Sequence, residues 1–248
     1  IYTKQDFDEK KVALYHNKFF TRFQKNIKHR QQIRLIRKYL TKDMTWIDAP
    51  IGSGRLMDYI KHPKSNSFGF DISKSFIKHN EKKGIQCFKG DLFNIQLERK
   101  FDLVTSLHTI FAFSDFRKIL SNYIGILKNG GYLIVDIVNL HLYKNFSYDK
   151  KFDKRVDVNG MELDQIYTFF ENLNCEVIEA LPHDYYDSEK MLYFRRDRRN
   201  IKSWLIRKAW KLINRIYWRA NLFYFFDKFE PLSKIEMFNK ILVVVKKR

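Results

Sequence analysis

The chain has 248 residues, of which 45% are hydrophobic and 30% charged. This composition is close to that of ordinary globular proteins, so it excludes wholesale disorder and a coiled-coil rod. No run approaches about 18 consecutive apolar residues, so we expect no transmembrane helix. Two isolated cysteines, Cys87 and Cys175, are too few for a disulfide framework and suit a reducing compartment. We therefore expect a cytoplasmic protein.

The net charge of +19 is distributed unevenly along the chain. Residues 1–43 carry 12 Lys and Arg against 4 Asp and Glu, and residues 195–219 carry 10 against 1. Residues 44–194 are nearly neutral, with 19 against 20. This distribution predicts a neutral working core and two basic segments that meet an anionic partner.

From Thr45 onward, short apolar runs typical of strands alternate with helical stretches. The alternation predicts a parallel sheet with helices on both faces. Asn129-Gly130-Gly131 is a strong stop signal for the third helix. The predicted strands are 45–50, 67–72, 85–91, 101–107 and 131–138, and the predicted helices between them are 55–61, 73–82 and 115–127.

The remaining segments extend this α/β pattern. A polar connection at 139–160 precedes a predicted helix at 161–173 and a strand at 174–181, and the chain closes with a strand at 240–247. No internal repeat and no Gly/Ser/Pro linker divides the chain.

The domain organisation predicted from this pattern is a single core with basic additions. We expect an α/β domain at 44–248 and a basic N-terminal helical extension at 1–43 packed on it. A basic, aromatic helical segment, about 196–226, lies in an insertion at about 182–238.

The segment Asp48–Arg55 (DAPIGSGR) connects the first strand to a helix. Glycines let a backbone approach a ligand closely, and the helix N-terminus offers N–H groups. A dinucleotide fingerprint needs a small residue where Met57 stands, which disfavours NAD and FAD. The Gly-Lys-Ser/Thr of a P-loop is also absent. An ordinary strand-to-helix turn is the alternative.

Two further acidic residues follow predicted strands. Asp71 closes the second strand, where a carboxylate can accept both hydroxyls of a ribose. Asp91 follows Gly90 after the third strand, where it can accept a hydrogen bond from an exocyclic amine. Each aspartate alone is more often a helix cap. With Asp48, three acidic strand ends favour a nucleoside ligand.

These segments together resemble the class I S-adenosylmethionine-dependent methyltransferases. DAPIGSGR is similar to the family's first motif, FGFDIS to the second, KGDL to the third, FDLVTSLHTIFAF to the fourth-strand segment and LKNGGYLIVDIVN to the turn into the fifth strand. The resemblance covers about 40–180, and KILVVVKK is similar to the antiparallel seventh strand. It implies an α/β, Rossmann-like fold with a seven-stranded, mostly parallel sheet and an antiparallel last strand.

The resemblance also implies a cofactor, S-adenosylmethionine, with S-adenosylhomocysteine as product. Carried over by position, Asp48 and the two glycines line the methionine part, Asp71 holds the ribose, and Asp91 holds the adenine. Pro50 departs from the motif, because the first glycine usually stands there. The cofactor-binding residues implied are Asp48, Pro50, Gly52, Gly54, Asp71, Ile72, Asp91, Leu92 and Leu107.

Methyl transfer from a sulfonium is an in-line displacement in which alignment supplies most of the acceleration, and a base matters most for a hydroxyl acceptor. Ligands lie beyond the carboxyl ends of the strands. This rule nominates His108 as base or substrate contact, His141 and His183 as weaker catalytic candidates, and Asn139 as a substrate contact. Tyr15 is a candidate lid over the site. Packing or a solvated surface position is the alternative for each.

Several chemistries are disfavoured. No Asn/Asp-Pro-Pro-Tyr/Phe segment follows the fourth strand, which argues against methylation of exocyclic base amines. Neither cysteine lies in a Pro-Cys context on that strand, which argues against a covalent adduct to pyrimidine C5. No His, Cys and carboxylate cluster has metal-ligand spacing, so no metal is predicted.

The basic segment 195–226 carries Trp and aliphatic residues at three- and four-residue spacing, with most charges on other faces. Such a helix suits the boundary of an anionic membrane. Capping of the domain and RNA binding are the alternatives, since both basic segments could track phosphates. The predicted membrane or anion contacts are Arg198, Arg199, Lys202, Trp204, Arg207, Lys208, Lys211, Arg215 and Trp218.

We therefore expect an S-adenosylmethionine-dependent methyltransferase, peripheral on the inner face of the membrane. Its acceptor is predicted to be an oxygen on a small-molecule, lipid-linked or glycan intermediate, or on a lipid headgroup. The alternatives are a tRNA or rRNA methyltransferase and a non-catalytic cofactor-binding scaffold.

Overall fold

The computed structural model describes residues 11–14, 16–17, 27–141, 159–185 and 238–248. Within these ranges, every helix is too short or too polar to cross a membrane.

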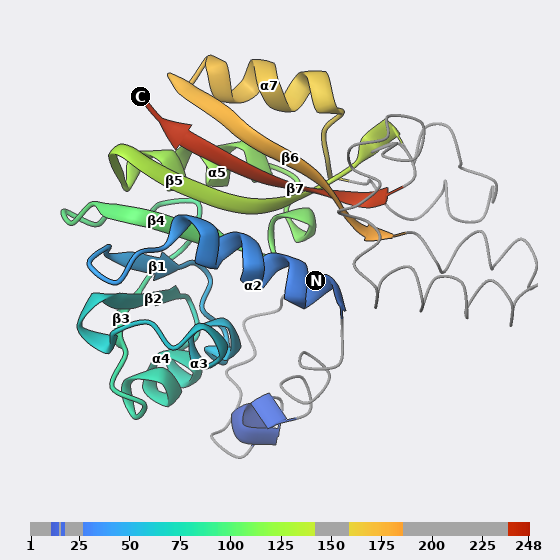
Figure 1. Cartoon of the computed structure of the whole chain (residues 1–248). Helices are drawn as coiled ribbons and strands as arrows, with labels where there is room; N and C mark the ends of the chain where they lie inside the picture. Colours follow the sequence, from blue (N-terminus) through green and yellow to red (C-terminus); the bar gives the residue numbers. More distant parts are fainter. Residues whose placement is uncertain (1–10, 15, 18–26, 142–158, 186–237) are drawn as a thin grey trace, which may run out of the picture.

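The described residues build one seven-stranded sheet with the order β3-β2-β1-β4-β5-β7-β6 (Figure 1). β1 pairs in parallel with β2 and β4, β3 with β2, and β5 with β4. β7 runs antiparallel to both β5 and β6, so the predicted fold class and the antiparallel last strand are confirmed. The strands are β1 Trp46–Asp48, β2 Ser67–Asp71, β3 Gln86–Lys89, β4 Phe101–Ser106, β5 Leu127–Val138, β6 Cys175–Tyr185 and β7 Phe238–Lys247.

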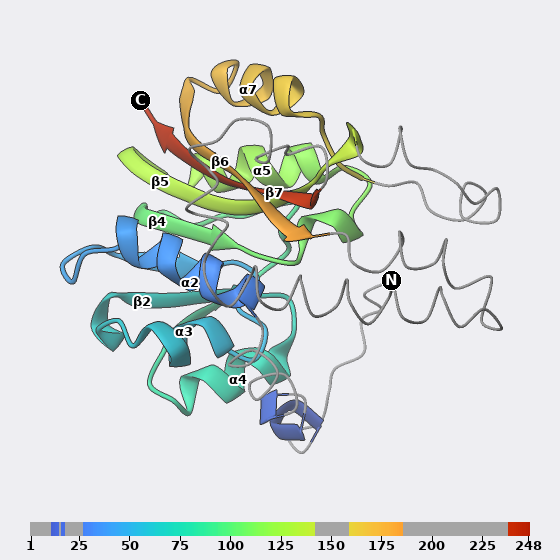
Figure 2. The same ribbon diagram turned by 45° about the vertical axis from the view of Figure 1, so that its right-hand side comes forward.

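Helices cover both faces of the sheet and form a three-layer sandwich (Figures 1 and 2). α2 and α3 pack on one face, and α5 and α7 pack on the other. The helices are α2 Ile27–Tyr39, α3 Arg55–Ile60, α4 Lys74–Glu81, α5 Phe116–Gly125 and α7 Leu163–Glu171.

The two helical layers are possible because successive strand residues point to opposite faces. In β1, Trp46 packs with Ile36 of α2, whereas the next residue, Ile47, packs in the core formed with α5 and α7. In β4, Leu103 likewise packs on the α2 side, and Val104 packs in the core formed with α5 and α7. A sheet that is covered on both faces needs such continuous apolar runs, and these runs are the signal from which the strands were predicted.

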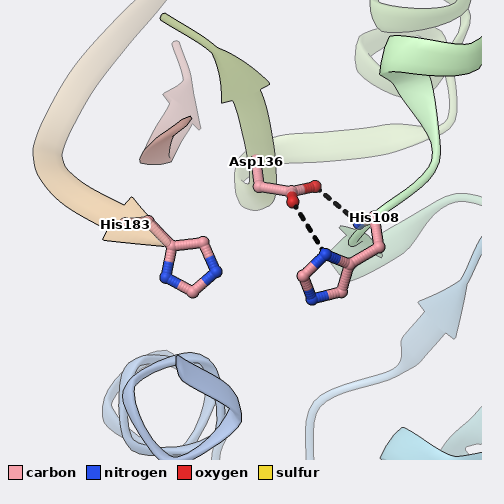
Figure 3. Close-up of side chains that lie close together, drawn as sticks. All are labelled: His108, Asp136 and His183. Atoms are coloured by element: carbon pink, nitrogen blue, oxygen red, sulfur yellow. Dashed lines mark hydrogen bonds and ion pairs between the residues drawn. The ribbon is translucent and has the colours of Figure 1, made fainter. Parts of the chain in front are cut away.

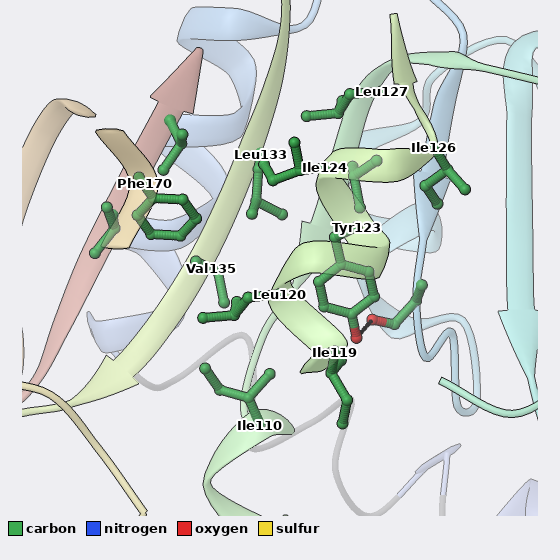
Figure 4. Close-up of a cluster of buried hydrophobic side chains, with 14 of the residues drawn as sticks. Ile110, Ile119, Leu120, Tyr123, Ile124, Ile126, Leu127, Leu133, Val135 and Phe170 are labelled. Carbon is green, nitrogen blue, oxygen red and sulfur yellow. Dashed lines mark hydrogen bonds between the residues drawn. The ribbon is translucent and has the colours of Figure 1, made fainter. Parts of the chain in front are cut away.

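The larger core lies between the sheet and α5 (Figure 4). Ile119, Leu120 and Tyr123 of α5 are fully buried, and each such side chain stabilises the fold by roughly 1.5–3 kcal/mol. The Tyr123 hydroxyl donates to the Ala49 carbonyl at 2.7 Å and lies 3.0 Å from Ser106 Oγ. α5 therefore holds the carboxyl ends of β1 and β4 in place, where the functional residues lie.

The predicted end of the third helix is wrong. α5 ends at Gly125 and β5 begins at Leu127, before the Asn-Gly-Gly sequence. Leu127 pairs with Phe101 and Tyr132 with Leu103, so the register shifts across the intervening residues. Gly130, with φ 78°, lies in this irregularity. The glycines serve a bulge in a strand rather than a helix stop.

β6 extends beyond the predicted 174–181 to Tyr185 because β7 pairs along it, with His183 opposite Lys240. The predicted basic N-terminal helix corresponds to α2, whose apolar residues, including Ile33 and Ile36, pack on the sheet. The predicted helix in the insertion lies outside the described residues, between β6 and β7.

Candidate functional site

The turn after β1 is built on two glycines with left-handed backbone. Gly52 has φ 51° and Gly54 has φ 73°. Residues other than glycine rarely adopt this left-handed backbone conformation. A Cβ at Gly54 would lie 1.9 Å from Asn80 Oδ1, and the Asn80 amide donates to the Gly52 carbonyl at 2.8 Å. Position 54 therefore requires glycine, both because its backbone is left-handed and because a Cβ would collide with Asn80.

Asp71 connects this turn to the end of β2. Its Oδ2 accepts the Gly52 N–H at 2.9 Å and its Oδ1 accepts the Ser73 N–H at 2.9 Å. Burial raises the Asp71 pKa, and these backbone hydrogen bonds oppose the rise. Each carboxylate oxygen has a second lone pair, so the group retains acceptor capacity for a hydroxyl.

Asp48 lies deeper than the sequence suggests. It is 5% exposed, and it accepts from Thr105 Oγ1 at 2.7 Å, which in turn accepts from Trp46 Nε1 at 2.9 Å. Burial raises the pKa of Asp48 to about 7. Through its hydrogen bond with Thr105, the Asp48 side chain therefore links β1 to β4 next to the glycine turn.

Polar and apolar groups alternate along the rest of this edge. Ile72 is 55% exposed although it is a large aliphatic residue next to Asp71. Asp91 is exposed, with Oδ1 accepting the Phe93 N–H at 3.0 Å, and Leu92 beside it is buried. Leu107 packs against the core on the α2 side. An apolar surface flanked by carboxylates, beside an open glycine turn, fits an adenosine moiety, because a nucleoside has both a flat apolar ring and hydroxyl donors.

A second group of side chains lies at the carboxyl ends of β4 and β5. His108, directly after β4, has φ 59°, a left-handed conformation that costs a non-glycine residue about 1–2 kcal/mol. Its backbone N–H donates to Asp136 Oδ1 at 2.6 Å, and its Nδ1 lies 3.3 Å from Asp136 Oδ2 (Figure 3). Asp136 lies within β5 and is fully buried. The buried carboxylate therefore offsets the strain and orients the imidazole.

Lys240 of β7 completes the charge balance. Its Nζ lies 2.6 Å from Asp136 Oδ2, 3.3 Å from His108 Nδ1 and 4.4 Å from the centre of the Phe111 ring. The Lys240 side chain is 8% exposed and that of Asp136 is fully buried. Such a pair is sensitive to the loss of either member, because the remaining charge would stay buried.

α2 contributes three polar side chains from the opposite direction. Gln32 Nε2 lies 2.9 Å from His108 Nε2 and 3.0 Å from His183 Nε2, and Gln32 Oε1 lies 3.1 Å from His29 Nδ1. Gln31 Oε1 lies 2.8 Å from His183 Nδ1. We call the resulting group the polar cluster; it consists of His29, Gln31, Gln32, His108, Asp136, His183 and Lys240.

The polar cluster also contains the donor types that bind transition metals. Single atoms of His108, Asp136 and His183 lie within 4.8 Å of one another (Figure 3). Two imidazoles and a carboxylate suit zinc or iron. However, the Lys240 ammonium lies beside both Asp136 Oδ2 and His108 Nδ1, and so supplies positive charge at the position where a cation would contact them.

The other predicted site residues lie elsewhere. Asn139 is buried in a backbone bridge with Met161, and its Oδ1 accepts the His141 N–H at 3.2 Å. Pro50 follows Ala49 through a cis peptide bond. The remaining predicted residues lie outside the described ranges; they are Tyr15, Arg198, Arg199, Lys202, Trp204, Arg207, Lys208, Lys211, Arg215 and Trp218.

The sequence predicts His108 and His183 at the same edge of the sheet but does not predict the other five members of the polar cluster. Two of the five carry a signal: Asp136 is a charge inside the apolar run LIVDIV, and Lys240 immediately precedes ILVVV. A charged residue in a buried strand must be paired, so each could have been matched with a partner. His29, Gln31 and Gln32 look like part of an ordinary polar helix.

Residues 47–135, which contain both the glycine turn and His108, match a family described as a methyltransferase domain. This part of the chain is therefore similar to a methyltransferase domain. This match and the fold agree with the S-adenosylmethionine-dependent methyltransferases that the sequence resembles. The resemblance seen in the sequence is confirmed.

Solved structures of the same fold include distant relatives. A SAM-dependent methyltransferase from Thermotoga maritima is 23% identical, with a TM-score of 0.50, over 70% of this chain and 83% of that one. A chain from the complex of the Haloferax volcanii Trm112 methyltransferase activator with a methyltransferase is 14% identical, with a TM-score of 0.60 over 98% of both chains. A SAM-dependent methyltransferase from Clostridium acetobutylicum is 15% identical, with a TM-score of 0.51, over 86% and 89%. Comparison with curated proteins finds no match.

Proposed function

We propose that this methyltransferase methylates a hydroxyl group of a small or lipid-linked acceptor, with His108 as general base. The observation that carries the proposal is the pairing of His108 with the buried Asp136 at the carboxyl end of β4. This end of the strand adjoins β1, which leads into the glycine turn. An imidazole next to a cofactor turn, held by a carboxylate, suits proton removal from a weakly acidic acceptor.

The cofactor supplies a methyl group on a positively charged sulfur. We propose that Gly52 and Gly54 accommodate its methionine part, that Asp71 accepts from the ribose hydroxyls, and that Ile72 and Asp91 flank the adenine. The positive φ at both glycines, the lack of space for a Cβ at Gly54 and the exposure of Ile72 support this assignment.

In the proposed reaction, His108 takes the proton of the acceptor hydroxyl while the methyl carbon leaves sulfur and bonds to oxygen. The C–S electron pair stays on sulfur, which becomes a neutral thioether. Asp136 stabilises the imidazolium that forms, since its carboxylate lies beside Nδ1. General-base catalysis of this kind contributes about 10²- to 10⁴-fold.

The acceptor is proposed to be a lipid headgroup or a lipid-linked or glycan intermediate at an anionic membrane surface. The basic aromatic segment 195–226 motivates this proposal. The exposed side of α2, which carries Arg30, Arg34, Arg37 and Lys38, supports it, because its buried side packs on the sheet. Part of this charge is used internally: Arg37 donates to the Tyr59 carbonyl, and Lys38 pairs with Glu179.

The proposal is tested by methyl transfer from tritium-labelled S-adenosylmethionine. The enzyme is incubated with total bacterial lipid extract as anionic vesicles and, separately, with total tRNA. We expect label in the lipid fraction and about 100-fold less label with His108→Ala. Calorimetric titration with S-adenosylhomocysteine is expected to give the same affinity for both proteins, which separates chemistry from cofactor binding.

Other results would lead to other functions. Label in tRNA, with a steep dependence on salt, would replace the lipid acceptor with RNA. Tight binding of S-adenosylhomocysteine with no transfer to either pool would favour the scaffold. Equal transfer by wild type and His108→Ala would remove His108 as base.

A further inference from the structure

We propose that Gln32 of α2 is a positioning residue that fixes the hydrogen-bond direction through the polar cluster, so that His108 presents Nε2 as its proton acceptor. The consequence for catalysis rests on the proposed function of His108. The direction itself follows from one fixed point, the Pro182 carbonyl, and does not depend on the reaction.

The fixed point is the Pro182 carbonyl. A carbonyl can only accept, so the Gln31 amide group that lies 3.0 Å away must be the NH₂. The opposite atom, Gln31 Oε1, then faces His183 Nδ1 at 2.8 Å and must accept from it. His183 therefore carries its proton on Nδ1 and, as a neutral imidazole, has a lone pair on Nε2.

This lone pair sets the orientation of Gln32. Because His183 Nε2 accepts, the Gln32 group 3.0 Å away must be the NH₂. The second hydrogen of that NH₂ points to His108 Nε2 at 2.9 Å, which therefore also accepts. The remaining atom, Gln32 Oε1, accepts from His29 Nδ1 at 3.1 Å. The Gln32 amide thus sets the tautomers of His108 and His29, whereas the Gln31 amide sets that of His183.

The other end of the cluster is His108 Nδ1, which lies between Asp136 and Lys240. It is 3.3 Å from Asp136 Oδ2, which can only accept, and 3.3 Å from Lys240 Nζ, which can only donate, so this end accommodates either tautomer of His108. Gln32, His183 and Asp136 are fully buried. If the Gln32 amide were turned by 180°, its oxygen would face the lone pair of His183 Nε2. These buried groups would then lose their hydrogen bond at the full cost of desolvation. The direction set from the Pro182 carbonyl therefore decides the tautomer of His108 in this proposal.

This arrangement also indicates what the acceptor must provide. An acceptor that binds at His108 Nε2 takes the place of one N–H of Gln32, so it has to donate a hydrogen bond of its own. A hydroxyl does this and a thiolate or carbon nucleophile does not. Before the acceptor binds, the Gln32 amide donates to His108 Nε2 the hydrogen bond that the acceptor hydroxyl replaces.

The experiment uses the whole protein labelled with ¹⁵N at histidine, without cofactor or acceptor. Long-range ¹H–¹⁵N correlation spectra distinguish Nδ1–H from Nε2–H imidazoles, and His108→Asn assigns the His108 signals. We expect Nδ1–H for His108 and His183 in the wild type. Gln32→Glu presents a carboxylate of the same shape to both Nε2 atoms, so we expect both histidines to gain a proton on Nε2. Gln86→Glu on β3, an exposed residue with the same change in charge, is the control and should leave the spectrum unchanged.

Unchanged His108 and His183 signals in folded Gln32→Glu would overturn the inference. If that variant does not fold, the wild-type spectrum still decides, because a proton on Nε2 of neutral His108 contradicts the proposed direction. Methyl transfer to the lipid extract distinguishes this inference from the function on which it rests. Altered protonation with transfer reduced about tenfold or more supports both. Altered protonation with unchanged transfer supports the role of Gln32 and removes His108 as the base.

Discussion

The two halves of the sheet's carboxyl edge are built in different ways. At the ends of β1 and β2, contacts join backbone to nearby side chains: Asp71 accepts from Gly52, 19 residues away, and from Ser73. In the polar cluster, side chains contact side chains across long distances in sequence. Gln31 and His183 are 152 residues apart, and His108 and Lys240 are 132 apart.

This difference has a chemical reason. A nucleoside cofactor is recognised by close approach of backbone and by carboxylates at strand ends, so its requirements can be met by one short segment. The proposed acceptor site is built from groups that converge from several elements: β5, β6, β7 and α2 each supply at least one, and His108 follows β4. The half proposed to bind the cofactor is therefore local in sequence, and the polar cluster is held together by tertiary packing.

The largest expected effect concerns the polar cluster. Asp136→Ala leaves the buried Lys240 ammonium without its carboxylate, and we expect a loss of about 3–5 kcal/mol in the free energy of unfolding. Urea denaturation measures this loss. The matched control is Lys128→Ala, which breaks the partly exposed pair with Asp102 and should cost about 1 kcal/mol or less. Equal losses in both variants would show that the polar cluster is not a tightly coupled unit.

A second prediction concerns Asp48, which lies between the two halves. Its pKa is raised to about 7 in the folded protein, so the folded state holds a proton that the unfolded state releases near pH 4. Stability that comes from this group is present at low pH and is lost as pH rises from about 4 to about 7, at roughly 1.4 kcal/mol per pH unit. Asp48→Asn should remove this loss.

The measurement for Asp48 is urea unfolding of wild type and variant at about pH 5 and about pH 8. The control, Asp102→Asn, should act in the opposite direction. Hydrogen bonds from Lys128 and Thr45 lower the Asp102 pKa, so its contribution is lost as pH falls. A wild type and Asp48→Asn that change equally with pH would contradict the raised pKa.

The smallest expected effect tests the cofactor half. Gly54→Ala forces a side chain into left-handed backbone at φ 73° and against Asn80, and we expect a loss of about 1–2 kcal/mol together with weaker binding of S-adenosylhomocysteine. Thermal unfolding and calorimetry measure the two effects. Gly125→Ala, where a Cβ meets nothing within 4 Å, should leave both unchanged or raise stability slightly. Unchanged cofactor affinity in Gly54→Ala would show that the turn does not approach the cofactor.

The sheet and the glycine turn after β1 could be predicted from the sequence alone. Apolar runs buried on both faces gave the strands, and DAPIGSGR with Asp71 located the turn, because these signals arise from residues close together in the chain. The end of α5 was predicted wrongly, since an Asn-Gly-Gly sequence serves a bulge as readily as a helix stop.

The polar cluster arises from packing between elements that are distant in sequence. His29, Gln31 and Gln32 carry no local signal, and their meaning appears when α2 packs across the sheet and places their polar ends against His108 and His183. The predicted strand ended at Leu181, before His183, and pairing with β7 extends it far enough to bury that histidine. A buried hydrogen-bond network depends on which groups meet, and that is a property of packing between distant segments rather than of any one segment.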